Sequence, residues 1–176
     1  MILFHGSNIE IDKIDLNKCR PYKDFGKGFY LTEIPDQAEK MARRVARIYG
    51  GRPCVTCFNF DNMTLHRSGL SVRSFDKPSK EWAIFVINNR SRTFQDIADP
   101  ECNIDCKYDI VTGPIANDDL ALLFRQFSRK MISIEELVRG MEYKQLTNQY
   151  SFHSERALNY LTKAGVTYFE QGRSTD

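Results

Sequence analysis

The 176-residue chain has few of the features that mark membrane, secreted or nucleic-acid-binding proteins. No apolar run approaches the length of a bilayer span, and the opening residues lack the charged and apolar regions of a signal peptide. The net charge is only +2, so no large basic excess points to nucleic acid. No repeat, low-complexity tract or linker interrupts the chain. We therefore expect one domain over residues 1–176, without a membrane partner.

The five cysteines, an odd number without a secretion signal, favour reduced thiols in the cytoplasm. Cys54 and Cys57 have CxxC spacing, and Cys102 and Cys106 lie four positions apart. The first pair lies in a strand pattern, however, where residues three apart point to opposite faces and are poorly placed to share a zinc ion. We expect free thiols and no metal site.

Apolar periodicity and capping residues predict alternating strands and helices joined by irregular segments. Ser79 is expected to cap one helix, and Ser133 with Glu136 has the spacing of a capping box. This order predicts a single α+β domain. Strands are expected at 1–5, 29–32, 53–60, 108–114, 148–153 and 166–169, and helices at 35–49, 80–89, 120–127, 134–141 and 154–161.

Two segments point to a specific chemistry, Phe4-His5-Gly6-Ser7 and the glycine-framed stretch from Asp24 to Thr32. Cleavage of a nicotinamide–ribose bond requires a fixed carboxamide, a held ribose and stabilisation of oxocarbenium-like charge. A histidine can hold a ribose hydroxyl, and a backbone turn at Gly6 can meet the carboxamide. The face of Tyr30 can stack on the pyridinium ring. The two segments therefore predict a nicotinamide clamp.

These motifs resemble those of the poly(ADP-ribose) polymerase branch of the ADP-ribosyltransferases, which places a His-Tyr-Glu triad on three strands. Nearly end to end, the chain also resembles an uncharacterised bacterial family of the same superfamily. The segments that carry this second likeness are DFGKGFYLT, 81–86, 108–114 and 148–153. The resemblance implies an ADP-ribosyltransferase-like fold, with a split antiparallel or mixed sheet and flanking helices, and NAD+ as substrate.

Carried over by position, the resemblance makes His5, Tyr30 and Gln149 the catalytic candidates. Gln149 stands where the polymerases have glutamate, and an amide cannot deprotonate an acceptor. Chain elongation is therefore not expected, whereas transfer of a single ADP-ribose or hydrolysis is. Arg20 is the natural partner for a pyrophosphate. The residues expected to bind NAD+ are His5, Gly6, Ser7, Arg20, Gly28, Phe29 and Tyr30.

Each candidate also has a structural interpretation. A histidine at the end of a strand is often only a hydrogen-bonding residue, and a strand tyrosine is often core. His153 and Asp109 are expected to be structural, while Glu142 and Glu155 are alternative acids if the loops bring them to the site.

The leading hypothesis is an NAD+-dependent mono-ADP-ribosyltransferase acting on a protein or nucleic-acid acceptor. The family resemblance suggests the toxin of a bacterial toxin–antitoxin pair, with an antitoxin protein as partner. The alternatives are an NAD+ glycohydrolase, a catalytically silent NAD+ or ADP-ribose binding module, and a nucleic-acid-binding protein that uses Arg43, Arg44 and Arg47.

Overall fold

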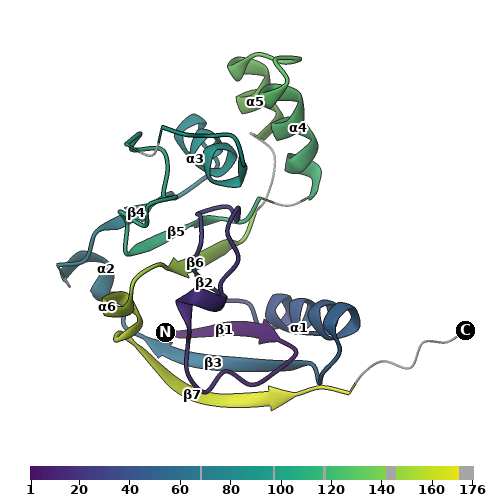
Figure 1. Ribbon diagram of the computed structural model, residues 1–176, viewed down its shortest axis with the longest axis vertical. Coiled ribbons are helices and arrows are strands. Elements are labelled where there is room, and N and C mark those ends of the chain that lie inside the picture. The colour runs from purple at the N-terminus through teal and green to yellow at the C-terminus, as the bar shows by residue number, and fades with distance from the viewer. Residues whose placement is uncertain (68, 97, 117, 142–145, 171–176) are drawn as a thin grey trace, which may run out of the picture.

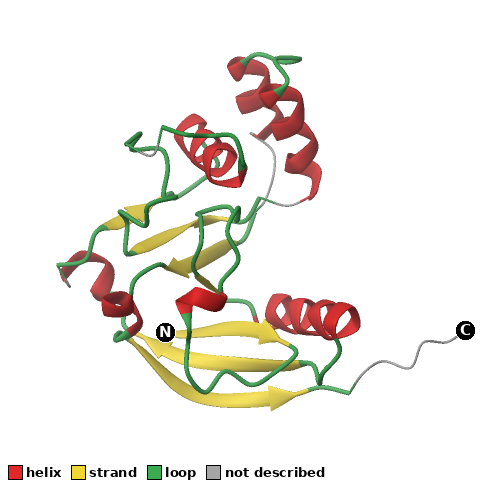
Figure 2. Cartoon of the chain, in the orientation of Figure 1, coloured by secondary structure: helices red, strands yellow, loops and turns green. Residues whose placement is uncertain are grey.

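The computed structural model describes residues 1–67, 69–96, 98–116, 118–141 and 146–170. Its described residues form a seven-stranded sheet, six α-helices and one 3-10 helix (Figure 1; Figure 2). In chain order the elements are β1 (Ile2–Ser7), η1 (Leu16–Lys18), β2 (Phe29–Thr32), α1 (Pro35–Tyr49), β3 (Cys54–Phe60), α2 (Thr64–Arg67), β4 (Val72–Ser74), α3 (Lys80–Arg90), β5 (Ile110–Pro114), α4 (Asp118–Ser128), α5 (Ile134–Met141), β6 (Asn148–Phe152), α6 (Glu155–Leu158) and β7 (Leu161–Tyr168).

The strands follow the order β4-β5-β6-β2-β1-β3-β7, and every neighbouring pair is antiparallel except β4 and β5. This mixed sheet with flanking helices confirms the predicted α+β class. Helix α1 lies beside the half made of β1, β3 and β7, whereas α3, α4 and α5 gather beside β4 and β5 (Figure 1). No helix of the described chain is long and apolar enough to cross a bilayer.

The sheet splits between β1 and β2. Strand β1 pairs with β3 along all six of its residues, but it pairs with β2 only where Phe4 meets Thr32. On its other edge, β2 pairs with β6 along all four residues, from Phe29 to Thr32. The backbone of His5, Gly6 and Ser7 therefore has a partner strand on one side only. The split separates the two halves of the molecule and lies where the two sequence motifs meet.

Alternation along β2 and β6 assigns residues to the two faces of the sheet. Phe29, Leu31 and Phe152 lie in one apolar cluster, which β1 and β3 extend. Tyr30 projects to the opposite face and packs against the cluster built around Trp82 of α3. The core is thus divided between the two faces, and β2 contributes to both.

The most evident difference from the predicted elements lies near the C-terminus. The helix expected over 154–161 ends at Leu158, and an eight-residue strand, β7, begins at Leu161. Seven residues of β3 pair with β7. The pairing of this segment with the sheet therefore overrides the helical pattern of its apolar residues. By contrast, the predicted caps are confirmed. Ser79 accepts from the Trp82 amide, and Ser133 and Glu136 exchange reciprocal bonds.

Candidate functional site

The fold brings three of the predicted site residues onto neighbouring strands. His5 lies on β1, Tyr30 on β2 and Gln149 on β6, and the three strands are adjacent in the order β6-β2-β1. Thr32 pairs with Phe4 on one side and with Gln149 on the other. The candidate site therefore straddles the split in the sheet.

Tyr30 and Gln149 share one face of the sheet, whereas the His5 ring leans toward the other. The register pairs Tyr30 with Ser151 and Thr32 with Gln149, so alternation places Tyr30 and Gln149 on the same side. The His5 ring stacks on Phe29 with centroids 4.4 Å apart. Its Nδ1 nevertheless reaches the Tyr30 carbonyl oxygen, 2.8 Å away, across the split. His5 thus bonds the β2 backbone beyond the last paired residues of β1 and β2.

This bond decides the protonation of His5. A carbonyl oxygen only accepts, so Nδ1 carries the hydrogen. Burial lowers the pKa of His5 from its ordinary value of 6.5, and the bond to Tyr30 only partly opposes this. The ring is therefore neutral at pH 7, which leaves a lone pair on Nε2. Within the described chain Nε2 has no hydrogen-bond partner, so His5 offers an acceptor that suits a hydroxyl group.

Tyr30 uses its hydroxyl to hold the turn that precedes it. The hydroxyl donates to the Gly26 carbonyl at 2.7 Å and accepts from the Phe25 amide at 3.0 Å. Burial raises the pKa of Tyr30 well above its ordinary value, and the nearby Asp24 adds to the effect. Tyr30 is therefore a neutral phenol fixed at its tip. The residue as a whole is partly buried, and its ring packs against Phe25 and His153.

The glycines of both motifs have packing roles. A Cβ at Gly6 would lie 1.9 Å from the Ala38 carbonyl oxygen, so glycine lets α1 approach β1 closely. Gly26 has a φ of +89°, and a Cβ there would lie 2.8 Å from the Asn103 carbonyl oxygen. A Cβ at Gly28 would lie 2.6 Å from Nδ1 of His153. The motif is therefore also a packing requirement.

Gln149 is held in a buried polar cluster that sequence reasoning missed. Its Nε2 lies 2.9 Å from Oδ2 of Asp24 and 3.5 Å from the Pro114 carbonyl oxygen. Asp24 also accepts from the Ala116 amide at 3.0 Å and pairs with Arg90. Asp24 and Gln149 are each 8% exposed, although both are polar. A charged residue opening an apolar motif was the available signal for Asp24, while Arg90 had none.

Other predicted residues lie apart from this cluster. Arg20 donates to the Tyr49 hydroxyl at 2.8 Å and lies over the Tyr49 ring, at the C-terminal end of α1. Phe29 is buried, and the Ser7 hydroxyl bonds Asn8. Glu155 is exposed on α6, past the opposite end of β6 from Gln149. Glu142 lies outside the described residues.

His153 packs against the turn that contains Lys27 and Gly28. Its Nδ1 lies 2.8 Å from the Lys27 carbonyl oxygen and its Nε2 lies 2.8 Å from the Ser151 hydroxyl. Its ring also meets the edge of Tyr30 at 6.3 Å. Burial lowers the pKa of His153 to about 4, so the ring is neutral at pH 7. These contacts match the structural role predicted for it.

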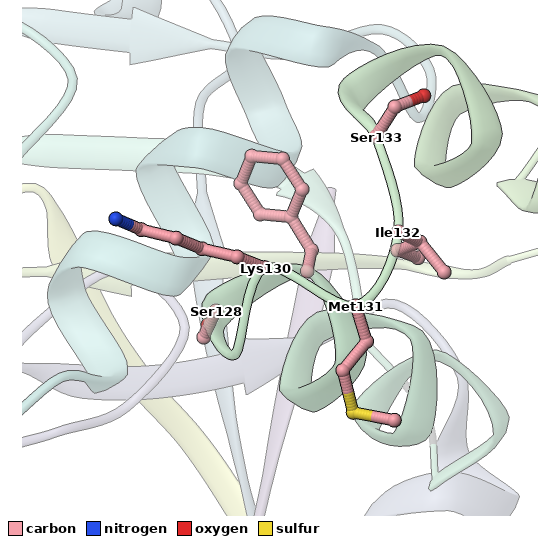
Figure 3. A pocket seen from close by; sticks show the side chains of 6 residues that line it. Ser128, Lys130, Met131, Ile132 and Ser133 are labelled. Carbon is pink, nitrogen blue, oxygen red and sulfur yellow. The ribbon is translucent and has the colours of Figure 1, made fainter.

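A surface hollow of 550 Å³ lies at the turn between α4 and α5 (Figure 3). Its lining is mostly apolar, and it lies in a different part of the molecule from β1, β2 and β6 (Figure 1). No group of acidic, histidine or cysteine side chains able to hold a metal ion occurs among the residues that the structure describes. The candidate site is therefore assigned to the polar groups on the strands beside the split, and not to this hollow. The residues that line the hollow are Phe127, Ser128, Lys130, Met131, Ile132 and Ser133.

Fold and site together define an α+β protein with a split mixed sheet and a buried polar cluster beside the split. A model of a family described as protein of unknown function (DUF3990) matches residues 1–162. The chain belongs to this family. Comparisons with curated proteins and with solved structures find no significant match.

Proposed function

We propose that this protein is an NAD+-dependent mono-ADP-ribosyltransferase. The observation that carries the proposal is the position of His5, Tyr30 and Gln149 on three adjacent strands at the split. The resemblance to the polymerase branch requires this arrangement of its triad, and the three residues are far apart in the sequence. The ADP-ribosyltransferase fold is part of the same proposal, and the split sheet supports it.

In the proposed reaction, the bond between the ribose C1″ and the nicotinamide nitrogen breaks, and its electron pair goes to the nitrogen. Neutral nicotinamide leaves, and positive charge develops on the ribose. The Nε2 lone pair of His5 accepts from a ribose hydroxyl, and the Tyr30 ring stacks on nicotinamide. The acceptor then bonds to C1″ and releases its proton to solvent, because the Gln149 amide is not a base.

NAD+ hydrolysis is the second candidate function, and the amide at position 149 favours it. Without a carboxylate there to activate a macromolecular acceptor, water competes more easily for C1″. The macromolecular acceptor, protein or nucleic acid, remains part of the leading proposal. So does a role as the toxin of a toxin–antitoxin pair.

Incubation of the purified protein with NAD+ labelled in its adenylate half tests the proposal. Label fixed on a macromolecule supports transfer, and free ADP-ribose supports hydrolysis. Binding of NAD+ without release of nicotinamide indicates the silent module. Neither binding nor release, with a folded protein and a cell extract as acceptor source, contradicts the whole proposal.

His5→Ala is expected to abolish nicotinamide release, and His66→Ala is its matched control because His66 is an exposed histidine on α2. Equal loss in both variants contradicts the assigned site. Toxicity on expression that His5→Ala removes and His66→Ala retains supports the toxin role.

A further inference from the structure

The cluster around Gln149 fixes the orientation of the side-chain amide. The two neighbours of Nε2 are a carboxylate oxygen of Asp24 and the Pro114 carbonyl oxygen, and both can only accept. The NH2 group must therefore occupy this position. Within the described chain, Oε1 has no hydrogen-bond partner. Among the described residues, Gln149 thus retains one unused acceptor on a side chain that is buried and oriented.

Asp24 is anchored more firmly than Gln149. Oδ1 accepts from Nε of Arg90 at 2.8 Å, and Nη2 of the same guanidinium lies 2.6 Å away in the ion pair while donating to the Ala116 carbonyl. Oδ2 accepts from the Ala116 amide and the Gln149 amide, at 3.0 and 2.9 Å. Three hydrogen bonds and the ion pair therefore engage both oxygens of the carboxylate. Its geometry suits it to hold a neighbour.

We propose that Asp24 is a positioning residue that locks the Gln149 amide so that Oε1 accepts a hydrogen bond from a ribose hydroxyl of NAD+. This inference rests on the proposed function. In it, Gln149 performs the part of the glutamate's role that an amide can perform, which is acceptance of a hydrogen bond. The Gln149 amide supplies no general base, so the acceptor must be a group that attacks C1″ without one at this position.

The lock also explains why glutamate does not suit this position. A carboxylate at 149 would lie about 3 Å from that of Asp24, and two such groups do not both ionise at that distance. A proton would be shared between them, and the added group would not act as a free base. We therefore expect Gln149→Glu to lower turnover.

The functional test compares Asp24→Asn with Asp109→Asn. Asp109 is the matched control because it is also buried and held by an arginine, while its partners, such as Ser154 and Arg156, are not at the split. For NAD+ consumption, we expect Asp24→Asn to lower kcat on the order of 10²-fold with a smaller change in KM, as for a misplaced reacting group. Asp109→Asn should leave kcat within about twofold of wild type.

A second measurement needs no NAD+. In the free protein, the side-chain amide NMR signals of Gln149, assigned by their absence in Gln149→Met, should exchange slowly with solvent. Asp24→Asn should speed this exchange, and Asp109→Asn should not. Fast exchange in the wild type overturns the lock, whatever the activity.

The outcomes separate this inference from the proposed function. A protected amide in a wild-type protein that neither binds nor consumes NAD+ overturns the proposed function and the role in NAD+ binding, while the lock itself is upheld. Equal losses of kcat in Asp24→Asn and Asp109→Asn, or a large gain in Gln149→Glu, overturn the positioning role.

Discussion

Among the described residues, two aspartates are buried, and each forms an ion pair with an arginine. Asp24 pairs with Arg90 beside the split in the sheet, and Asp109 pairs with Arg156 near the end of β6. Their exposed fractions are similar, 8% and 4%. Burial and an arginine partner therefore do not distinguish a candidate site from a structural anchor. The remaining donors make the difference.

The donors to Asp109 fasten segments together. They are the Ser71 amide, the Ser154 hydroxyl and the Arg156 guanidinium. Ser154 in turn caps α6 by accepting from the Ala157 amide. Burial raises the pKa of Asp109, but the bonds from Arg156 and Ser154 outweigh it and hold the pKa below 3.8. This cluster therefore holds three segments of the chain together, which is a structural role.

The Asp24 cluster contains one group whose capacity is not used up. Gln149 donates to Asp24 through Nε2, and its Oε1 has no partner within the part of the chain that the structure describes. A buried polar cluster thus points to function when one member is oriented and still incompletely bonded. Four predictions examine this contrast, from the largest expected effect to the smallest.

Asp24→Ala should be the most destabilising change in either cluster. The change leaves Arg90 without its ion-pair partner and leaves the Ala116 and Gln149 amides without their acceptor. Removal of one partner of a buried ion pair lowers the free energy of unfolding by about 3–5 kcal/mol. Asp109→Ala should cost less, because the Arg156 side chain is 62% exposed and can return to water. Urea denaturation measures both free energies of unfolding. A larger loss for Asp109→Ala contradicts the prediction.

His153 connects Asp109 to the turn at Lys27 and should make the fold sensitive to acid. Its amide donates to the Asp109 carbonyl, and its ring contacts the Lys27 carbonyl in the glycine-framed turn. The pKa is about 4 when folded and 6.5 as the ordinary value, so between these values the unfolded chain binds the extra proton. Stability present above pH 6.5 is therefore lost as the pH falls toward 4. The loss from His153 amounts to about 3 kcal/mol.

The measurement is the unfolding free energy between pH 7 and pH 4 for wild type and His153→Gln. The variant should show a flatter profile across this window. His5, whose pKa is also lowered, contributes a loss of the same sign in both proteins, so the difference between the profiles isolates His153. The pKa of Asp109 is lowered from 3.8, so its contribution is lost mostly at the acid end of the window and below it, and in both proteins. Parallel profiles contradict the prediction.

Local patterns of the sequence were sufficient for most of the fold. Strand alternation and capping residues act between neighbours in the chain, so β2, β3 and the starts of α3 and α5 were predictable. Of β7, only the second half was predicted, as a strand over 166–169. Its first half was not predicted as strand, because the pairing with β3 joins residues that are distant in the chain. Strand β4 was missed for the same reason, since it pairs with β5 across a turn-rich segment that shows no strand pattern.

The candidate site divides in the same way. Motif resemblance gave His5, Tyr30 and Gln149, and the sheet places their strands side by side. The partners of Asp24, Arg90 and Gln149, lie 66 and 125 residues away in the chain. No local sequence pattern therefore predicts these contacts. The glycines illustrate the converse. They were selected as signs of ligand binding, and each also proves necessary for packing.

Tyr30→Phe should distinguish the structural role of the hydroxyl from the proposed stacking role of the ring. The change removes the bonds to the Gly26 carbonyl and the Phe25 amide, next to Asp24, and should cost about 2 kcal/mol of unfolding free energy. Because the ring remains, the Kd for NAD+ should change by less than about threefold, whereas Tyr30→Ala should weaken binding more strongly. Calorimetric titration with NAD+ measures both. Equal affinities of the two variants contradict a stacking role.

The smallest changes give the sharpest comparison of the two clusters. Gln149→Met removes one donor from Asp24, and Ser154→Ala removes one donor from Asp109. Gln149→Met should cost about 1 kcal/mol, since the other donors to Asp24 remain. Ser154→Ala should cost somewhat more, because Ser154 also caps α6 by accepting from the Ala157 amide. Only Gln149→Met should lower nicotinamide release, because only Gln149 has an acceptor to offer a substrate. If Ser154→Ala lowers release as much as Gln149→Met at equal stability, turnover depends on the rigidity of the fold, and the distinction between the two clusters fails.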